Sequence, residues 1–341
     1  MKINFVFLIS LSIFFSNDSF SHHSNAPHYD RDKPISIIGI VEEFDFVNPH
    51  SFLYIRSDLN GESVVWECEM QTANTLIKQG WTANQFEVGQ QVIVNAIAAR
   101  RDPLGCSFTN AEMPDGSIIN RSGSIETPEE IAFNYDREIL INNKPNFKGP
   151  WKRDLANRGM GLGPGSQRPQ VDRLTDKGLI AAESYDERFD DPSFQCSASS
   201  ISRVWSEPGT VTDIIQTEEF IHIIHEYMDT TRVVILTEDH QPSYVDRPYG
   251  HSIGWYEGNT LVIDTIGFEG GVLTPHPGVM HSNQLHMIER LHLNDDGMSF
   301  VVSWVAEDPL YFKTPFEGTR HFIPSAYDIE PYGCIPEIAK R

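Results

Sequence analysis

Residues 51–69 read SFLYIRSDLNGESVVWECE, and this stretch decides the fold of the first part of the chain. Two runs of β-branched and aromatic residues, 51–57 and 63–69, flank the Asp-Leu-Asn-Gly turn at 58–61, a pattern typical of a β-hairpin. The preceding run, 35–47 (ISIIGIVEEFDFV), predicts another strand. We therefore expect three successive strands in this region.

A short helix and two further strands should follow these three. Residues 72–79 (TANTLIKQ) predict a helix that starts near Thr72, and 91–97 and 106–113 predict strands. Three strands, a short helix and two strands are the order of an OB-type small barrel. Residues 22–125 are thus expected to form an OB-like β-barrel domain.

Residues 175–341 should form a second, larger domain built from hairpins. Turn sequences join 251–256 to 260–266 and 284–293 to 299–306. Hairpins repeated at this spacing indicate an antiparallel β-barrel or a sandwich. We prefer a barrel of lipocalin-like design, which would enclose its own interior. The expected fold class is therefore mostly β: an OB-like small barrel, then an antiparallel barrel or sandwich.

Residues 126–174 separate the two expected domains. From 143 to 173 this segment is rich in Gly, Pro, Arg and Asn and has no apolar periodicity. Such a composition is typical of a linker or of a segment wrapped over the surface.

Residues 1–21 have the features of a secretory signal peptide. Lys2 supplies the positive end, residues 5–15 are apolar apart from two serines, and small residues stand at 19 and 21. No other apolar run approaches the roughly 18–20 residues that span a bilayer. We expect cleavage after Ser21, a periplasmic or secreted location and no transmembrane segment.

The cysteines are expected to meet an oxidising compartment and to form disulfides. None has the spacing of a CxxC motif or a zinc finger. Four cysteines allow three pairings, and the sequence does not choose among them. We prefer Cys68 with Cys106 and Cys196 with Cys334, because each bridge then stays within one expected domain.

The charge of the chain argues against nucleic acid as a partner. The net charge is −22, with 26 Lys and Arg against 48 Asp and Glu. Residues 22–125 contain 7 basic and 13 acidic residues, and 7 − 13 = −6. Binding to phosphate backbones needs clustered cations, so no nucleic acid is expected even at an OB-like barrel.

Histidines near the expected mature terminus form a candidate metal site. After cleavage, His22 would offer its α-amine and its imidazole to one metal ion, and His23 or His50 would supply a further nitrogen. Such a nitrogen set suits copper(II). The competing interpretation is an ordinary chain terminus that happens to carry histidines.

A second set of candidates lies in the expected C-terminal barrel. On the strand 284–293, Glu289 shares a face with Leu285, Met287 and Leu291, so it should be a carboxylate in an apolar wall. Burial would raise its pKa, as a general acid or base requires; the alternative is a structural ion pair. The candidate acid–base residues are His251, Asp264, His281, His286, Glu289 and Arg290.

Several short motifs resemble a family of exported bacterial proteins, domain of unknown function 6152. His-His-Ser at 22–24, Val-Asn-Pro-His at 47–50 and Gly-Trp-Thr at 80–82 carry the resemblance, which covers about residues 22–120. The second half is similar to a larger domain often fused behind that family, through Gly-His-Ser at 250–252 and Glu-Gly-Asn-Thr-Leu-Val-Ile-Asp-Thr at 257–265. The chain departs from that pattern at Trp255 and Tyr256. The resemblance implies export and two domains and assigns no activity.

Three functions remain open from the sequence. The first is an exported protein that binds a small apolar or mixed-polarity ligand, with a copper-type site at the mature N-terminus. The alternative is a periplasmic isomerase or hydrolase that uses the candidate acid–base residues in a barrel pocket. The third is a structural or partner-binding envelope protein. No nucleotide cofactor is expected, because neither a phosphate loop nor a Rossmann fingerprint occurs.

Overall fold

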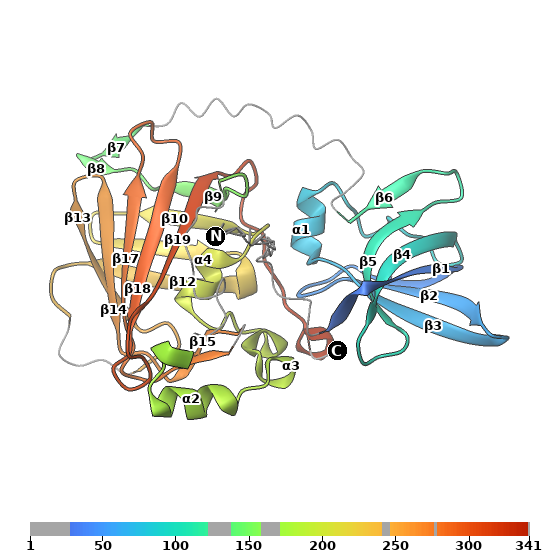
Figure 1. Cartoon of the computed structure of the whole chain (residues 1–341). Helices are drawn as coiled ribbons and strands as arrows, with labels where there is room; N and C mark the ends of the chain where they lie inside the picture. Colours follow the sequence, from blue (N-terminus) through green and yellow to red (C-terminus); the bar gives the residue numbers. More distant parts are fainter. Residues whose placement is uncertain (1–27, 122–137, 158–170, 241–245, 276–277, 340–341) are drawn as a thin grey trace, which may run out of the picture.

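The computed structural model describes residues 28–121, 138–157, 171–240, 246–275 and 278–339. The expected signal peptide, His22 and His23 lie outside these residues. Figure 1 shows two bodies rich in β-structure, with the C-terminal segment running between them. None of the helices in the described residues has the length and apolarity needed to cross a membrane.

The N-terminal body has the strand order that the sequence predicts. Its elements are β1 (Tyr29–Asp45), β2 (Phe52–Leu59), β3 (Glu62–Glu69), α1 (Ala73–Lys78), β4 (Gln91–Ala99), β5 (Gly105–Glu112) and β6 (Ile118–Asn120). β1 pairs with β2 and β4, and a parallel pairing of β3 with β5 closes the sheet on itself. Helix α1 lies between the third and fourth strands, as in an OB-type barrel.

Local chemistry explains where α1 begins and how the small barrel closes. Thr72 precedes the helix, and its side-chain oxygen accepts a hydrogen bond from the backbone N–H of Thr75. Cys68 and Cys106 face each other in the parallel pairing of β3 with β5 and form a disulfide. The second disulfide joins Cys196 to Cys334. The preferred cysteine pairing is therefore confirmed.

The C-terminal body is a closed barrel, which decides between the barrel and the sandwich. Its strands within the described residues are β9 (Gly149–Arg153), β10 (Val211–Gln216), β11 (Phe220–His225), β12 (Thr230–Leu236), β13 (His251–Glu257), β14 (Thr260–Ile266), β17 (His286–Leu293), β18 (Phe300–Glu307) and β19 (Phe316–Pro324). The chain closes the ring where β9 pairs with both β10 and β19.

Short elements surround this barrel. They are the hairpins β7 (Leu140–Ile141) with β8 (Lys144–Pro145) and β15 (Gly271–Thr274) with β16 (Val279–His281), the helices α2 (Asp176–Glu183), α3 (Glu187–Asp190), α4 (Ile201–Ser206) and α5 (Pro336–Ala339), and 3-10 turns at Val171–Arg173, Pro192–Gln195 and Tyr227–Asp229.

The barrel departs from the sequence-based expectations in two places. The segment expected as a linker, 126–174, supplies β9, because Trp151 is completely buried in the barrel core. The pairing of β12 with β13 is parallel, while the other neighbours in the ring are antiparallel.

Large aromatic side chains fill much of the barrel interior. Trp304 on β18 lies directly opposite Gly318 on β19, and a Cβ at that glycine would lie 2.1 Å from the Trp304 ring. Trp205 of α4 is also buried inside, with its ring 5.3 Å from that of Phe322. The barrel is therefore packed through much of its length rather than hollow.

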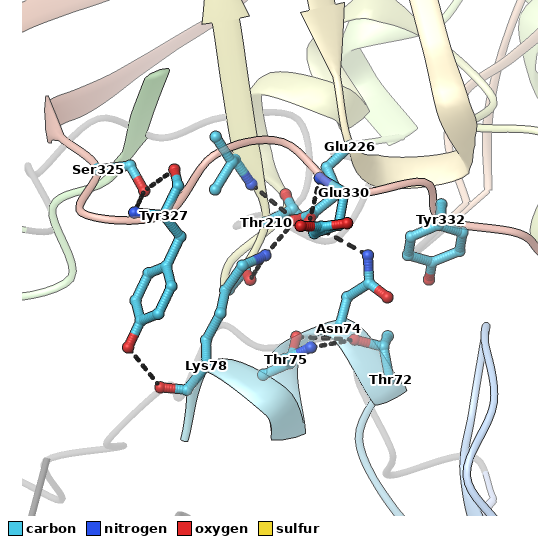
Figure 2. Close-up of polar contacts among 12 residues, drawn as sticks. Thr72, Asn74, Thr75, Lys78, Thr210, Glu226, Ser325, Tyr327, Glu330 and Tyr332 are labelled. Atoms are coloured by element: carbon cyan, nitrogen blue, oxygen red, sulfur yellow. Dashed lines mark hydrogen bonds and ion pairs between the residues drawn. The ribbon is translucent and has the colours of Figure 1, made fainter. Parts of the chain in front are cut away.

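The two bodies meet at a buried carboxylate, Glu226, which follows β11. Figure 2 shows this carboxylate facing α1 of the N-terminal body. It accepts hydrogen bonds from the Asn74 amide at 3.1 Å and from the backbone N–H of Val211 at 2.9 Å, and it forms an ion pair with Lys78. The Glu226 side chain is completely buried and that of Lys78 is 14% exposed. This pair therefore joins the two bodies where little water can screen it.

The C-terminal segment reinforces the same contact. Asn48 donates hydrogen bonds to the Asn74 side-chain oxygen at 2.8 Å and to the Tyr332 carbonyl at 2.5 Å. The Tyr327 hydroxyl donates to the Lys78 carbonyl at 3.1 Å, as Figure 2 shows. The disulfide at Cys334 attaches this segment to the barrel domain. The tail thus contacts both bodies and holds them together.

Replacing Glu226 should destabilise the contact between the bodies. In Glu226→Gln, the Lys78 ammonium stays buried without a counter-charge, and breaking a buried pair costs about 3–5 kcal/mol. We expect chemical denaturation to show a decrease of that size in the free energy of unfolding. The control is Glu183→Gln, the same change at an exposed position on α2, whose free energy of unfolding should stay within about 0.5 kcal/mol of the natural value. Equal stability of the two variants would contradict a structural role for the pair.

Candidate functional site

A cavity of about 690 Å³ opens at one end of the C-terminal barrel. It lies where β10 and β12 end, beside the β7–β8 hairpin and the last part of β13. The lining residues are Ile141, Asn142, Lys144, Lys148, Gln216, Thr217, Glu218, Leu236, Thr237, Glu238, Gly254, Trp255 and Tyr256. Sites for small organic molecules typically occupy about 300–1,000 Å³, so this cavity has a suitable size.

Tyr256 and Gln216 form a fixed polar pair in the wall of the cavity. Gln216 donates from its amide nitrogen to the Pro145 carbonyl and to the Tyr256 hydroxyl oxygen, both at 3.0 Å. Its amide oxygen accepts from the backbone N–H of Phe147 at 2.9 Å. Burial raises the pKa of Tyr256 to about 12, so the hydroxyl keeps its proton at neutral pH. The hydroxyl oxygen is therefore occupied while its O–H can still donate.

The charged residues of the cavity are two lysines and two glutamates. The Lys144 ammonium lies 5.2 Å from the centre of the Tyr256 ring. Among the described residues, neither Lys144 nor Lys148 has an ion-pair partner. The Glu218 carboxylate accepts a hydrogen bond from the Asn142 amide at 3.0 Å, and Glu238 is exposed. All four charged side chains are exposed and lack an ion-pair partner among the described residues, and Lys144 is the one placed over the Tyr256 ring.

Glu289 faces the barrel interior, as strand alternation predicts, and is completely buried. Its partner is Arg232 on β12, whose guanidinium donates to both carboxylate oxygens at 2.5 and 2.6 Å. The Trp205 indole N–H donates to the same carboxylate at 2.5 Å. A carboxylate held by three donors in a packed core has the geometry of a structural ion pair, which was the alternative interpretation of the sequence.

Asp264 and His286 do come together, on the outer wall of the barrel. One oxygen of the Asp264 carboxylate lies 3.0 Å from Nε2 of His286 and 3.0 Å from Nε2 of His240. Burial alone would raise the pKa of Asp264, but the two imidazoles hold it below its usual value. The hydrogen bond to Asp264 raises the pKa of His286. His240 is a partner that sequence reasoning missed, because it lies outside any strand.

The remaining barrel candidates are Arg290, His281 and His251. Arg290 forms an exposed ion pair with Glu257. His281 is buried, its Nδ1 lies 3.1 Å from the Ser282 carbonyl, and burial lowers its pKa. His251 is half-buried at the start of β13. None of the six predicted acid–base residues lines the cavity.

His50, the described member of the predicted metal site, lies beside a carboxylate. Its Nδ1 is 2.9 Å from an oxygen of Glu69, and the Tyr29 hydroxyl donates to the other oxygen. Burial alone would raise the pKa of Glu69, but His50 and Tyr29 hold it at about 2. Carboxylates commonly orient metal-binding histidines in this way. The described residues alone do not contain a group of three or more side chains suited to a metal ion.

Sequence reasoning missed the residues of the cavity, although part of the signal was present. Ser252, Gly254 and Tyr256 share one face of β13, and Tyr256 pairs with Leu261 in the buried wall of β14. The same alternation that placed Glu289 inside could have placed Tyr256 there. Gln216 and Lys144 could not be found in this way, because they come from a strand end and a short hairpin.

Glu289→Gln tests the structural interpretation of the buried pair. The change leaves the Arg232 guanidinium buried without a counter-charge, so we expect a loss of about 3–5 kcal/mol in the free energy of unfolding. Arg290→Gln is the matched control on the next residue of β17, where an exposed pair contributes about 0–1 kcal/mol. Denaturant titration compares the two variants. A Glu289→Gln variant as stable as the control would show that the pair is dispensable for folding.

The comparisons with known proteins concern the N-terminal body. No curated protein shows significant similarity to the chain. Residues 11–106 match the model of a family of unknown function, DUF6152. The resemblance drawn from the motifs at 22–24, 47–50 and 80–82 is therefore confirmed for the N-terminal part of the chain, which is similar to that family.

Proposed function

We propose that this chain is an exported protein that binds a small molecule of mixed polarity in the cavity of its C-terminal barrel. The observation that carries the proposal is the cavity of about 690 Å³ with a positioned tyrosine hydroxyl in its wall. Ligand sites typically combine apolar walls with a few fixed polar groups. Leu236, Trp255 and the Tyr256 ring provide the apolar surface here.

The arrangement of the cavity favours binding over acid–base catalysis. The residues that the sequence offered as catalytic acids and bases do not line the cavity. Tyr256, which does line the cavity, keeps its proton because burial raises its pKa to about 12. A group with this pKa donates hydrogen bonds at neutral pH and is a poor general base.

A neutral fluorescent probe, N-phenylnaphthylamine, tests whether the cavity binds organic molecules. We expect saturable fluorescence enhancement with the purified protein, because the probe would leave water for an apolar wall. Thr237→Trp, which fills the cavity from its lining, should abolish that enhancement. Thr231→Trp is the matched control, since Thr231 lies on β12, the strand that ends just before Thr237, and is exposed on the outer face.

The two tryptophan variants are expected to differ in probe binding. The probe is excited directly, so that its fluorescence does not depend on the added tryptophan. Binding should be unchanged in Thr231→Trp and lost in Thr237→Trp, with both variants folded as judged by circular dichroism. If Thr237→Trp bound the probe as well as the natural protein does, the cavity would not be the binding site and the proposal would fail.

A second candidate function is copper(II) binding at the mature N-terminus. The observation that favours it is the Glu69–His50 contact, which orients the imidazole. The described chain begins at His28, next to Tyr29, which donates to the same carboxylate. The six steps along the chain from His22 to His28 can span up to about 20 Å, which gives His22 the reach to approach His50.

The free terminus makes this second proposal easy to test. Mature protein beginning at His22 should bind copper(II) at least about tenfold more tightly than protein with one extra glycine before it, a difference of about 1.4 kcal/mol. His50→Ala should weaken binding as well. His292→Ala, the loss of an exposed histidine on β17, is the control and should have no effect. Calorimetric titration that gave one affinity for all four proteins would refute the site.

A further inference from the structure

We infer that the ligand of the barrel cavity is an organic anion, whose acidic group is held by the Tyr256 hydroxyl and the Lys144 ammonium. This inference rests on the proposed function and adds the chemical class of the ligand. The inference follows from the donor groups of the cavity, the Tyr256 O–H and the Lys144 ammonium, that have no acceptor among the described residues.

The fixed polar pair in the wall presents a donor. Both hydrogen bonds from the Gln216 amide nitrogen and the bond to its oxygen are made within the protein. The Tyr256 hydroxyl oxygen accepts from Gln216, so the group that remains is the hydroxyl proton. A ligand at this position must supply an acceptor, because a second donor would leave the O–H unpaired.

The position of Lys144 favours the same kind of ligand. Lys144 lies over the Tyr256 ring without an ion-pair partner among the described residues, and Lys148 adds a second positive charge to the lining. Glu218 accepts from Asn142, and both glutamates are exposed, as are the two lysines. What favours an anion is that Lys144, 5.2 Å from the Tyr256 ring centre, is the charged side chain with a contact to the tyrosine, so an acidic group that accepts from the hydroxyl would lie near this ammonium.

A cationic ligand fits this arrangement poorly. Aromatic side chains commonly bind organic cations through the face of the ring. In this cavity the Lys144 ammonium already occupies that position over Tyr256, at 5.2 Å from the ring centre. A ligand cation would have to displace Lys144 or approach it against like-charge repulsion, which is costly in a partly enclosed site.

Two probes that differ by one acidic group test the inference. Anilinonaphthalenesulfonate has the skeleton of N-phenylnaphthylamine with an added sulfonate. We expect the natural protein to bind the sulfonate at least about tenfold more tightly at low ionic strength, and this preference should shrink as salt screens the lysines. Thr237→Trp should lose both probes, which would place both in the cavity rather than on the exposed surface.

Single substitutions then assign the preference to named groups. Lys144→Gln and Tyr256→Phe should each weaken binding of the sulfonate by at least about threefold, and their binding of the neutral probe should stay within about twofold of the natural value. Lys177→Gln, the same loss of charge at an exposed position on α2, is the control and should change neither affinity.

The outcomes separate the two proposals. If the neutral probe binds in the cavity but the sulfonate shows no preference, or if Lys144→Gln and Tyr256→Phe keep the full preference, the inference of an anionic ligand is wrong and the binding function stands. If neither probe binds, both proposals fail. Loss of the preference in the two cavity variants, with the control unchanged, would support both.

Discussion

The constraint on which the rest of the barrel domain depends is the closure of a sheet whose side chains alternate between inside and outside. Every second residue of each strand must face the interior, whatever its polarity. Gly318 faces inside and makes room for the Trp304 ring. Glu289 faces inside, and its carboxylate is held by a bidentate contact with the Arg232 guanidinium. Tyr256 faces inside near one end and is fixed by Gln216. In the packed interior the Glu289 carboxylate is held by Arg232 and Trp205, whereas at the cavity the Tyr256 hydroxyl accepts from Gln216 and keeps its own proton as a donor.

Alternation is also the reason why much of the fold could be predicted from the sequence. Long runs such as 35–47 and 284–293 identify strands and their inward faces without knowledge of neighbours. The order of strands around α1 indicated the OB-type barrel, and the position of one cysteine pair in each domain indicated the disulfides. Glu289 was placed on the correct face by this reasoning. The strand β9 was missed because its five residues, which begin with Gly-Pro, show no alternation of apolar and polar side chains. Its pairing with β10 and β19 is what identifies it as a strand.

The candidate site could be predicted only in part, because alternation assigns a face and not a neighbour. The partner of Glu289 is Arg232, 57 residues earlier in the chain, and nothing in either strand alone pairs them. Asp264 contacts His240, which lies in an irregular segment, and the cavity is lined by Lys144, which lies on a hairpin of two-residue strands. Such contacts are set by the order of strands around the ring. A parallel neighbour such as β12 with β13 changes that order in a way that hairpin patterns do not reveal.

The contact between the two bodies lies at the end of the barrel strands opposite to the cavity. Glu226 follows the last residue of β11, and Val211, which donates to it, begins β10. The cavity lies at the other ends of these strands, where β10 finishes at Gln216 and the turn to β11 starts. The N-terminal body and the C-terminal tail are therefore attached away from the cavity. Because Trp205 fills the interior beside His225, at the end of β11, the packed core and the polar contact stabilise one end of these strands. The cavity, where we propose that a ligand binds, opens at the other end.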